Sequence, residues 1–189
     1  NLIPALGPET FYDSLLYHLG IPQLYVSAHG FVPSPRILYS HLSFAQEMLY
    51  TLALLLQGDT LAKLISWTCG VGLTFGTAAL GQRLGHPRSG AWTAALLGCT
   101  PAVLFNGRIT GTENALSLWC LLALWAALRW RERPETKWLI LTGVFGGLAA
   151  GTKYVGVFAC AVLGVMILST SRPLAPGGGE GGGEGMGAG

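Results

Sequence analysis

The chain has 189 residues, of which 51% are hydrophobic and only 11% are charged, and its mean hydropathy is +0.49. Soluble globular domains carry roughly 25% charged residues, so these values disfavour a water-soluble globule. A formal net charge of +2 is too small to indicate nucleic-acid binding. The composition therefore predicts a membrane protein with no nucleic-acid partner.

Residues 1–60 form the first predicted unit, an outer segment with helices that lie at the membrane surface. The stretch 11–19 has helical spacing, which places Asp13 and Tyr17 on one face with His18 nearby. A second amphipathic helix is expected over 43–56, and its uncharged core is too short to cross a bilayer. Five tyrosines suit the membrane interface, where one end of the ring is wet: Tyr12, Tyr17, Tyr25, Tyr39 and Tyr50. The acids Glu47 and Asp59 are interpreted as helix-surface and turn residues.

Residues 61–171 contain uncharged runs of the length that membrane helices need. Crossing a bilayer takes about 20 apolar residues, within a range of about 17–25. Two of the runs reach that length only with their flanking residues. The predicted spans are about 61–82, 89–107, 113–130, 137–152 and 154–171. The predicted fold class is therefore all-α, a polytopic membrane protein with about five transmembrane helices and amphipathic juxtamembrane helices.

Residues 138–171 allow an alternative, one long helix with Lys153 in its middle. A lysine at the bilayer centre costs about 2.5–3.5 kcal/mol. The glycines at 146, 147 and 151 also weaken a continuous helix. We therefore favour a hairpin of two short helices with Lys153 at its tip.

The charge distribution predicts the orientation in the membrane. With five spans, seven of the eleven basic residues fall on the side of the loops 83–88 and 129–137. The positive-inside rule makes that side cytoplasmic and leaves residues 1–60 outside. Since the chain begins with Asn1 rather than Met, we expect a preceding span that brings this segment out. Residues 172–189 are expected to be a disordered Gly-rich tail, either natural or a scar of truncation.

The cysteines and histidines do not indicate a metal site. All four cysteines fall in apolar runs without metal-ligand spacing, and His29 and His41 are spaced too loosely for zinc. No metal is predicted.

Three stretches carry a resemblance to a known family. The segment YDSLLYHLGIPQLY at 12–25, followed by Tyr39-Ser40-His41 and Gly58-Asp59, is similar to the first outer loop of the GT-C membrane glycosyltransferases. This superfamily includes protein O-mannosyltransferases and lipid A aminoarabinose transferases. RITGTENA at 108–115 resembles the second outer loop, although the family usually has Asp where this chain has Glu113, and GTKY at 151–154 resembles a Thr-Lys turn. The likeness covers about residues 5–172, the N-terminal catalytic half of such an enzyme.

The resemblance implies a membrane enzyme that moves a sugar from a polyprenyl-phosphate donor to a lipid, glycan or protein acceptor. The reaction is expected to proceed with inversion at the outer face of a bacterial plasma membrane, among membrane lipids. The lipid-linked sugar is a substrate, and no further cofactor is expected. Because the later spans of such enzymes lie outside residues 1–189, we expect this stretch alone to be inactive.

The chemistry needs a base for the acceptor proton and positive charge for the leaving phosphate. Asp13 is the best candidate for the base, and Glu113 is a second catalytic candidate that orients the acceptor or shares the base role. For substrate binding, Lys153 and then Arg108 suit the phosphate, and Tyr17 and His18 suit the sugar. The alternatives are structural: a solvated or capping Asp13, a helix-dipole carboxylate at Glu113, a structural histidine at His18, and cations that pair with lipid headgroups.

Two other function classes stay open at this point. A transporter or channel module places charges near the bilayer midplane, whereas most charges here fall at the ends of the predicted spans. A non-catalytic membrane scaffold is the third class.

Overall fold

The computed structural model describes residues 2–33 and 38–170, and within these residues it is helical and contains no strand. The predicted all-α class is therefore confirmed for the part of the chain that is described. In chain order the elements are α1 (Leu2–Leu6), the π-helical turn η1 (Ser14–His18), α2 (Gly20–Ser27), the 3₁₀ turn η2 (Leu38–His41), α3 (Ala45–Leu56), α4 (Asp59–Arg83), α5 (Pro87–Gly98), α6 (Pro101–Asn106), α7 (Glu113–Glu132), α8 (Thr136–Thr152) and α9 (Gly156–Thr170). The predicted tail at 172–189 lies outside the described residues.

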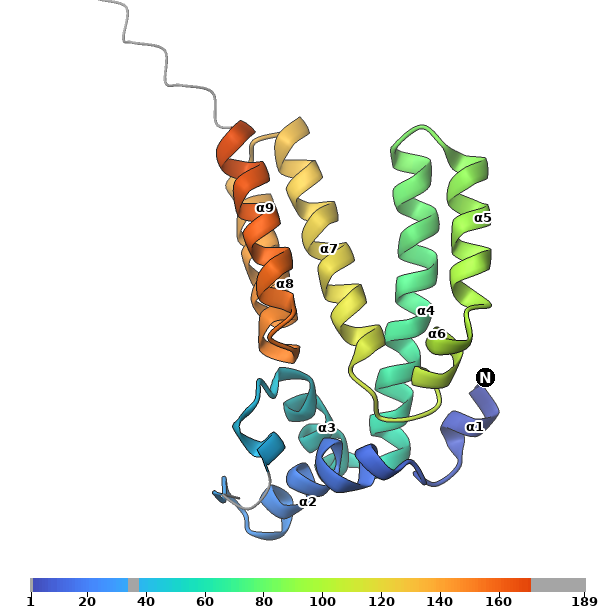
Figure 1. Cartoon of the computed structure of the whole chain (residues 1–189), viewed down its shortest axis with the longest axis vertical. Helices are drawn as coiled ribbons and strands as arrows, with labels where there is room; N and C mark the ends of the chain where they lie inside the picture. Colours follow the sequence, from blue (N-terminus) through green and yellow to red (C-terminus); the bar gives the residue numbers. More distant parts are fainter. Residues whose placement is uncertain (1, 34–37, 171–189) are drawn as a thin grey trace, which may run out of the picture.

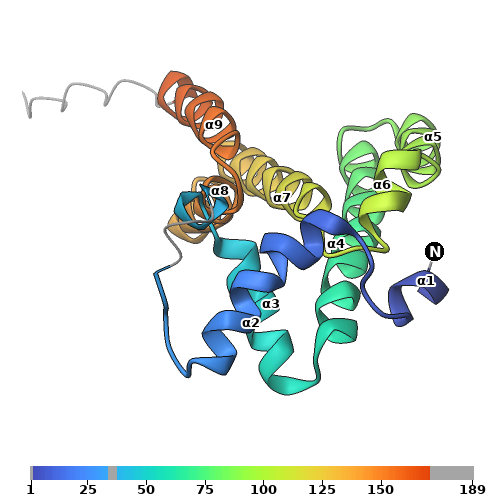
Figure 2. The same cartoon turned by 60° about the horizontal axis from the view of Figure 1, so that its bottom comes forward.

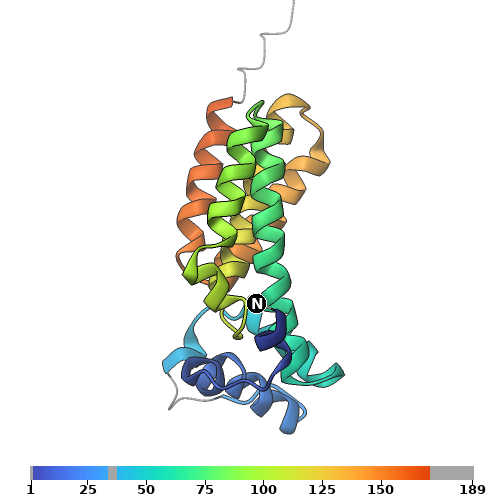
Figure 3. The same cartoon turned by 90° about the vertical axis from the view of Figure 1, so that its right-hand side faces the viewer.

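The elements form a bundle with a layer across one end. Helices α4, α5, α7, α8 and α9 run alongside one another, and the N-terminal elements lie beneath them (Figures 1 and 3). In Figure 2, α2 and α3 lie side by side across this end. The turns α4–α5 and α7–α8 both lie at the far end (Figure 1), so the loops 83–88 and 129–137 share one side of the bundle.

One helix in the described chain, α4 with 25 residues, is long and apolar enough to cross a membrane. The predicted span 89–107 is not one helix, because it divides into α5 and α6. The break comes at Thr100, whose extended backbone (φ −65°, ψ 126°) suits a residue that precedes a proline. Pro101 then begins α6, where its missing N–H does no harm. Five spans stay a prediction.

The chain from Trp138 to Thr170 forms two helices, as the hairpin interpretation expects. Lys153 lies between α8 and α9 in an extended conformation (φ −149°, ψ 145°). The two helices approach closely, since a Cβ on Gly156 would lie 2.3 Å from backbone atoms of Ala149. The single-helix alternative is wrong. The α8–α9 turn, which contains Lys153, lies at the same end of the bundle as the N-terminal layer (Figure 1).

Helix α3 is amphipathic with its polar face inward. Its buried residues include Glu47, which is 3% exposed, and Tyr50, which is fully buried and donates its hydroxyl to the carbonyl of Gly111 at 2.7 Å. The interpretations of Glu47 as a surface residue and of Tyr50 as an interfacial residue are therefore wrong. Leucines occupy the exposed face: Leu49, Leu52, Leu55 and Leu56. An outward apolar face suits contact with lipid and leaves the polar face for the end of the bundle.

Glycines allow α4 and α5 to meet backbone to backbone. A Cβ added to Gly81 would lie 2.3 Å from the Cα of Gly90, and one added to Gly90 would lie 2.7 Å from the Cα of Gly81. Neither neighbour can rotate away, because both contacts are to main chain. The α4–α5 hairpin therefore depends on glycine at both positions.

We expect Gly81→Ala to lower the free energy of unfolding by about 1–3 kcal/mol, because the methyl group forces the two backbones apart. The matched control is Gly143→Ala in α8, where an added Cβ meets nothing within 4 Å. That control should leave stability unchanged or raise it by up to about 1 kcal/mol through helix propensity. Thermal unfolding of both variants in the same bicelles checks this, and equal effects would contradict it.

Candidate active site

Asp13, Tyr17 and His18 lie on a π-helical turn near the start of the chain. Asp13 directly precedes η1, and Tyr17 and His18 end it. The turn is closed by the N–H of Leu19, which donates to the carbonyl of Ser14 at 2.7 Å. Single π turns are rare, and they occur frequently at functional sites.

His18 is held by a carboxylate from α3. Its Nδ1 lies 2.7 Å from Oε1 of Glu47, and the two side chains are only 6% and 3% exposed. The ring of Tyr17 lies against that of His18, with centroids 4.1 Å apart, and stacks on Tyr39 of η2 at 4.4 Å. The π turn is therefore fixed by contacts with two later elements, η2 and α3.

Three acids act on the Tyr17 hydroxyl. Partial burial is the main cause that raises the pKa of Tyr17 to about 12, and the charges of Asp13, Glu113 and Glu47 and the neighbouring Tyr39 raise it further. Tyr17 is thus a neutral hydrogen-bonding group at physiological pH. The same interactions show that Asp13 and Glu113, which are 100 residues apart in the sequence, lie within electrostatic reach of one side chain.

Glu113 and Lys153 form an ion pair between the start of α7 and the α8–α9 turn. Nζ of Lys153 contacts Oε1 of Glu113, and the side chains are 36% and 50% exposed. The other carboxylate oxygen accepts a bond from the N–H of Thr112 at 3.1 Å. This pair is therefore open to solvent and to a ligand, unlike the pair of His18 and Glu47.

Arg108 does not join this cluster through an ion pair in the described part of the chain. Its guanidinium lies over the ring of Phe105, 4.8 Å from the centroid. It lines a cavity of about 380 Å³, together with Glu9 and Lys63. The structure thus groups five of the six predicted site residues and leaves Arg108 apart from them, beside this cavity.

Lys63 anchors the N-terminal segment, a role that the sequence did not indicate. The side chain is buried, and Nζ donates three hydrogen bonds at 2.9–3.1 Å to backbone carbonyls of the first eight residues. The acceptors are the carbonyl oxygens of Pro4, Gly7 and Pro8. All three ammonium hydrogens are thereby used, so Lys63 holds the chain and is not free for a ligand.

Glu9 is the second anchor, and it joins the N-terminal segment to the loop before α7. Its Oε2 accepts bonds from the N–H and the hydroxyl of Thr110 at 2.8 and 3.1 Å. Its Oε1 accepts from the N–H groups of Thr10 and Phe11. The carboxylate therefore sets the path of the chain just before Asp13.

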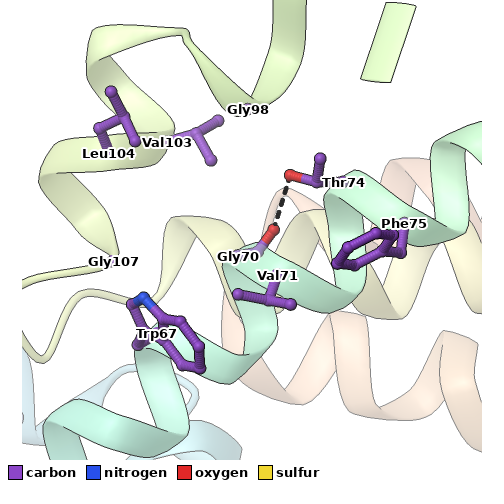
Figure 4. A pocket seen from close by; sticks show the side chains of 9 residues that line it. All are labelled: Trp67, Gly70, Val71, Thr74, Phe75, Gly98, Val103, Leu104 and Gly107. Atoms are coloured by element: carbon purple, nitrogen blue, oxygen red, sulfur yellow. Dashed lines mark hydrogen bonds between the residues drawn. The ribbon is translucent and has the colours of Figure 1, made fainter. Parts of the chain in front are cut away.

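An apolar groove of about 200 Å³ opens between α4 and the α5–α6 segment (Figure 4). The hydroxyl of Thr74 donates to the carbonyl of Gly70 within its own helix at 2.9 Å, so this polar group is already satisfied. The other lining residues include Trp67, Val71, Phe75, Val103 and Leu104. A groove of this character suits a hydrocarbon chain.

No group of three or more His, Cys, Asp or Glu side chains in the described residues is arranged to share a metal ion. The predicted absence of a metal requirement stays a prediction.

Comparison with known proteins identifies the family. A family model described as dolichyl-phosphate-mannose-protein mannosyltransferase matches residues 60–174, more than half of the chain. The chain belongs to this family. Its members are membrane glycosyltransferases that use a polyprenyl-phosphate-linked sugar and, in general, a protein acceptor. No curated protein and no solved structure matches the chain.

The family match and the site overlap in part. Glu113 and Lys153 lie within the matched range, whereas Asp13, Tyr17 and His18 precede it. The bundle is therefore the part that carries the family likeness, and the N-terminal layer brings the remaining site residues to its end.

The sequence did not indicate the roles of Glu47, Glu9 and Lys63. Glu47 had a usable signal, because Gln46, Glu47 and Tyr50 form a polar stripe opposite the leucines of α3.

We expect Lys63→Met to lower the free energy of unfolding by about 1–3 kcal/mol, since it removes three hydrogen bonds that hold the N-terminal segment against α4. Limited proteolysis should then cut residues 1–12 faster, and thermal unfolding should begin earlier. Arg88→Met, at an exposed position of α5, is the control that also removes one positive charge. The anchoring role is contradicted if both variants resist protease equally.

Proposed function

We propose that this chain forms part of an inverting GT-C glycosyltransferase that moves a sugar from a polyprenyl phosphate to an acceptor at the outer face of a bacterial plasma membrane. The observation that carries the proposal is the gathering of Asp13, Glu113 and Lys153 at one end of a bundle of the mannosyltransferase family. One acid, one exposed ion pair and two aromatic side chains meet there. These are the groups that the reaction requires.

In the proposed reaction, Asp13 takes the proton from an acceptor hydroxyl as its oxygen bonds to the anomeric carbon of the sugar. The bond from that carbon to the phosphate oxygen breaks, and the polyprenyl phosphate leaves with the electron pair. Lys153 stabilises the charge on the leaving phosphate. Attack from the face opposite the phosphate inverts the anomeric centre.

The ion pair between Glu113 and Lys153 fits this sequence of events. A phosphate that approaches Lys153 competes with the carboxylate for the same ammonium hydrogens. When the donor is bound, Glu113 is free to orient the acceptor hydroxyl beside Asp13. Tyr17, which is neutral at physiological pH, and His18 provide hydrogen bonds for the sugar.

The arrangement in the membrane is proposed from the bundle and its charges. Five spans across residues 61–171, with residues 1–60 outside and the loops 83–88 and 129–137 cytoplasmic, agree with the common end that these loops occupy. Arg88, Arg131 and Arg133 are exposed at that end. The apolar groove beside α4 offers a place for the isoprenoid chain of the donor.

We expect Asp13→Asn to lower sugar transfer by about 100-fold or more, because the amide cannot take the acceptor proton. Donor binding should be little changed. Transfer is measured from a labelled polyprenyl-phosphate sugar in proteoliposomes, with Glu135→Gln, at the opposite end of the bundle, as the control acid variant. Transfer at the wild-type rate by Asp13→Asn would refute the base role.

We expect Lys153→Gln to raise the KM for the donor about tenfold, because the phosphate loses a charge-assisted hydrogen bond at a partly exposed site. The matched control is Lys137→Gln, a lysine of the opposite end that is 62% exposed and also pairs with a glutamate. Donor titrations of both variants decide. A donor KM that rises equally in the two variants would indicate a general effect of charge and not a phosphate site.

A further inference from the structure

Glu47 has a negative charge that its packing does not require. The side chain is 3% exposed, its Oε1 bonds His18, and its Oε2 has no hydrogen-bond partner among the described residues. Burial of an ionised carboxylate with one oxygen unsatisfied is costly. A glutamine amide oxygen could accept the same bond from Nδ1 without that charge. The carboxylate therefore points to a role beyond the fold.

Other segments of the candidate site also contain buried polar atoms without partners among the described residues. The hydroxyls of Ser14 on η1 and of Thr112 before α7 are fully buried and unpartnered within the described residues. Folded proteins leave few such atoms, and each one calls for an explanation. Ser14 lies on the same turn as His18, and Thr112 directly precedes Glu113, so both hydroxyls belong to segments that carry candidate site residues.

A carboxylate only accepts hydrogen bonds, so the bond to Glu47 requires that Nδ1 of His18 carries the hydrogen. In the neutral ring this leaves Nε2 as an acceptor, suited to a hydroxyl hydrogen. The bond from Nδ1 to Glu47 holds the ring in that tautomer. An amide at position 47 would allow the opposite tautomer through its N–H₂ group.

We propose that Glu47 is a positioning residue for sugar transfer, which fixes His18 so that Nε2 accepts a hydroxyl hydrogen of the donor sugar or of the acceptor. The inference rests on the proposed function and adds a residue and a direction of hydrogen bonding to it. Glu47 also ties the π turn that follows Asp13 and contains Tyr17 to α3, so the contact that orients His18 also helps to hold the base in place.

The test is Glu47→Gln in the full-length protein in proteoliposomes, with His18→Gln and the double variant. We expect kcat to fall about tenfold or more in each single variant, and no further in the double variant, because both substitutions remove one unit of function. In His18→Gln, a raised KM for the donor assigns the hydroxyl to the sugar, and a raised KM for the acceptor assigns it to the acceptor.

The control is Tyr50→Phe, one turn further along α3. It removes a buried bond from the same helix, to the carbonyl of Gly111, and leaves the pair of His18 and Glu47 intact. We expect this variant to unfold at a lower temperature and to keep the wild-type kcat. It separates loss of stability from loss of positioning.

Three results would overturn the inference. A wild-type kcat in Glu47→Gln would show that the charge is not used. Losses of kcat that follow the unfolding temperature equally in Glu47→Gln and Tyr50→Phe would show a structural role alone. No transfer by the wild-type protein would overturn the proposed function and this inference with it, whereas normal wild-type transfer beside the first two results overturns the inference only.

Discussion

Buried polar bonds between the N-terminal layer and the end of the bundle decide where the candidate site forms. Helices in lipid gain little from the hydrophobic effect when they associate, so close packing and hydrogen bonds must position them. Here Lys63 of α4 holds the carbonyls of the first residues, and Glu9 holds Thr110 of the loop before α7. Asp13 follows Glu9 by four residues, so its place relative to Glu113 is set by these anchors.

The site that results has its charges divided into two kinds of pair. His18 and Glu47 are buried, so water does not compete with their bond and the geometry is rigid. Glu113 and Lys153 are partly exposed, so their bond is screened and is easily exchanged for one to a ligand. One pair is therefore suited to hold a structure in place and the other to open for a phosphate. Asp13 depends on both pairs. The first pair fixes the turn that follows Asp13, and in the proposed reaction the second pair opens to bind the donor phosphate.

The sequence was sufficient for the features that depend on local patterns. Uncharged runs located α4 and α7, and the cost of a lysine in a bilayer led to the two helices on either side of Lys153. The outer-loop motif grouped Asp13, Tyr17 and His18 correctly, because residues within one helical turn must lie close together. The contacts of Lys63 and Glu9 could not be foreseen, since their partners are up to 59 and 101 residues away. The break at Thr100 had a local signal in Pro101, which the hydropathy of the run outweighed.

The inverted polarity of α3 connects the membrane to the chemistry. In a water-soluble protein, a helix with four exposed leucines and a buried Gln–Glu–Tyr stripe would be unstable, because its apolar side chains would face water while its polar side chains are buried. At the surface of a bilayer the same helix is satisfied on both sides, with leucines in the lipid and polar groups against the bundle. A transporter would need the charge of Lys153 near the midplane, whereas Lys153 lies at the turn beside this polar layer. A scaffold would need no charge at Glu47, where an apolar residue would pack with less cost. The polar stripe of α3 therefore supports the proposed catalysis at the membrane surface, in which a lipid-borne donor would meet an acceptor in water.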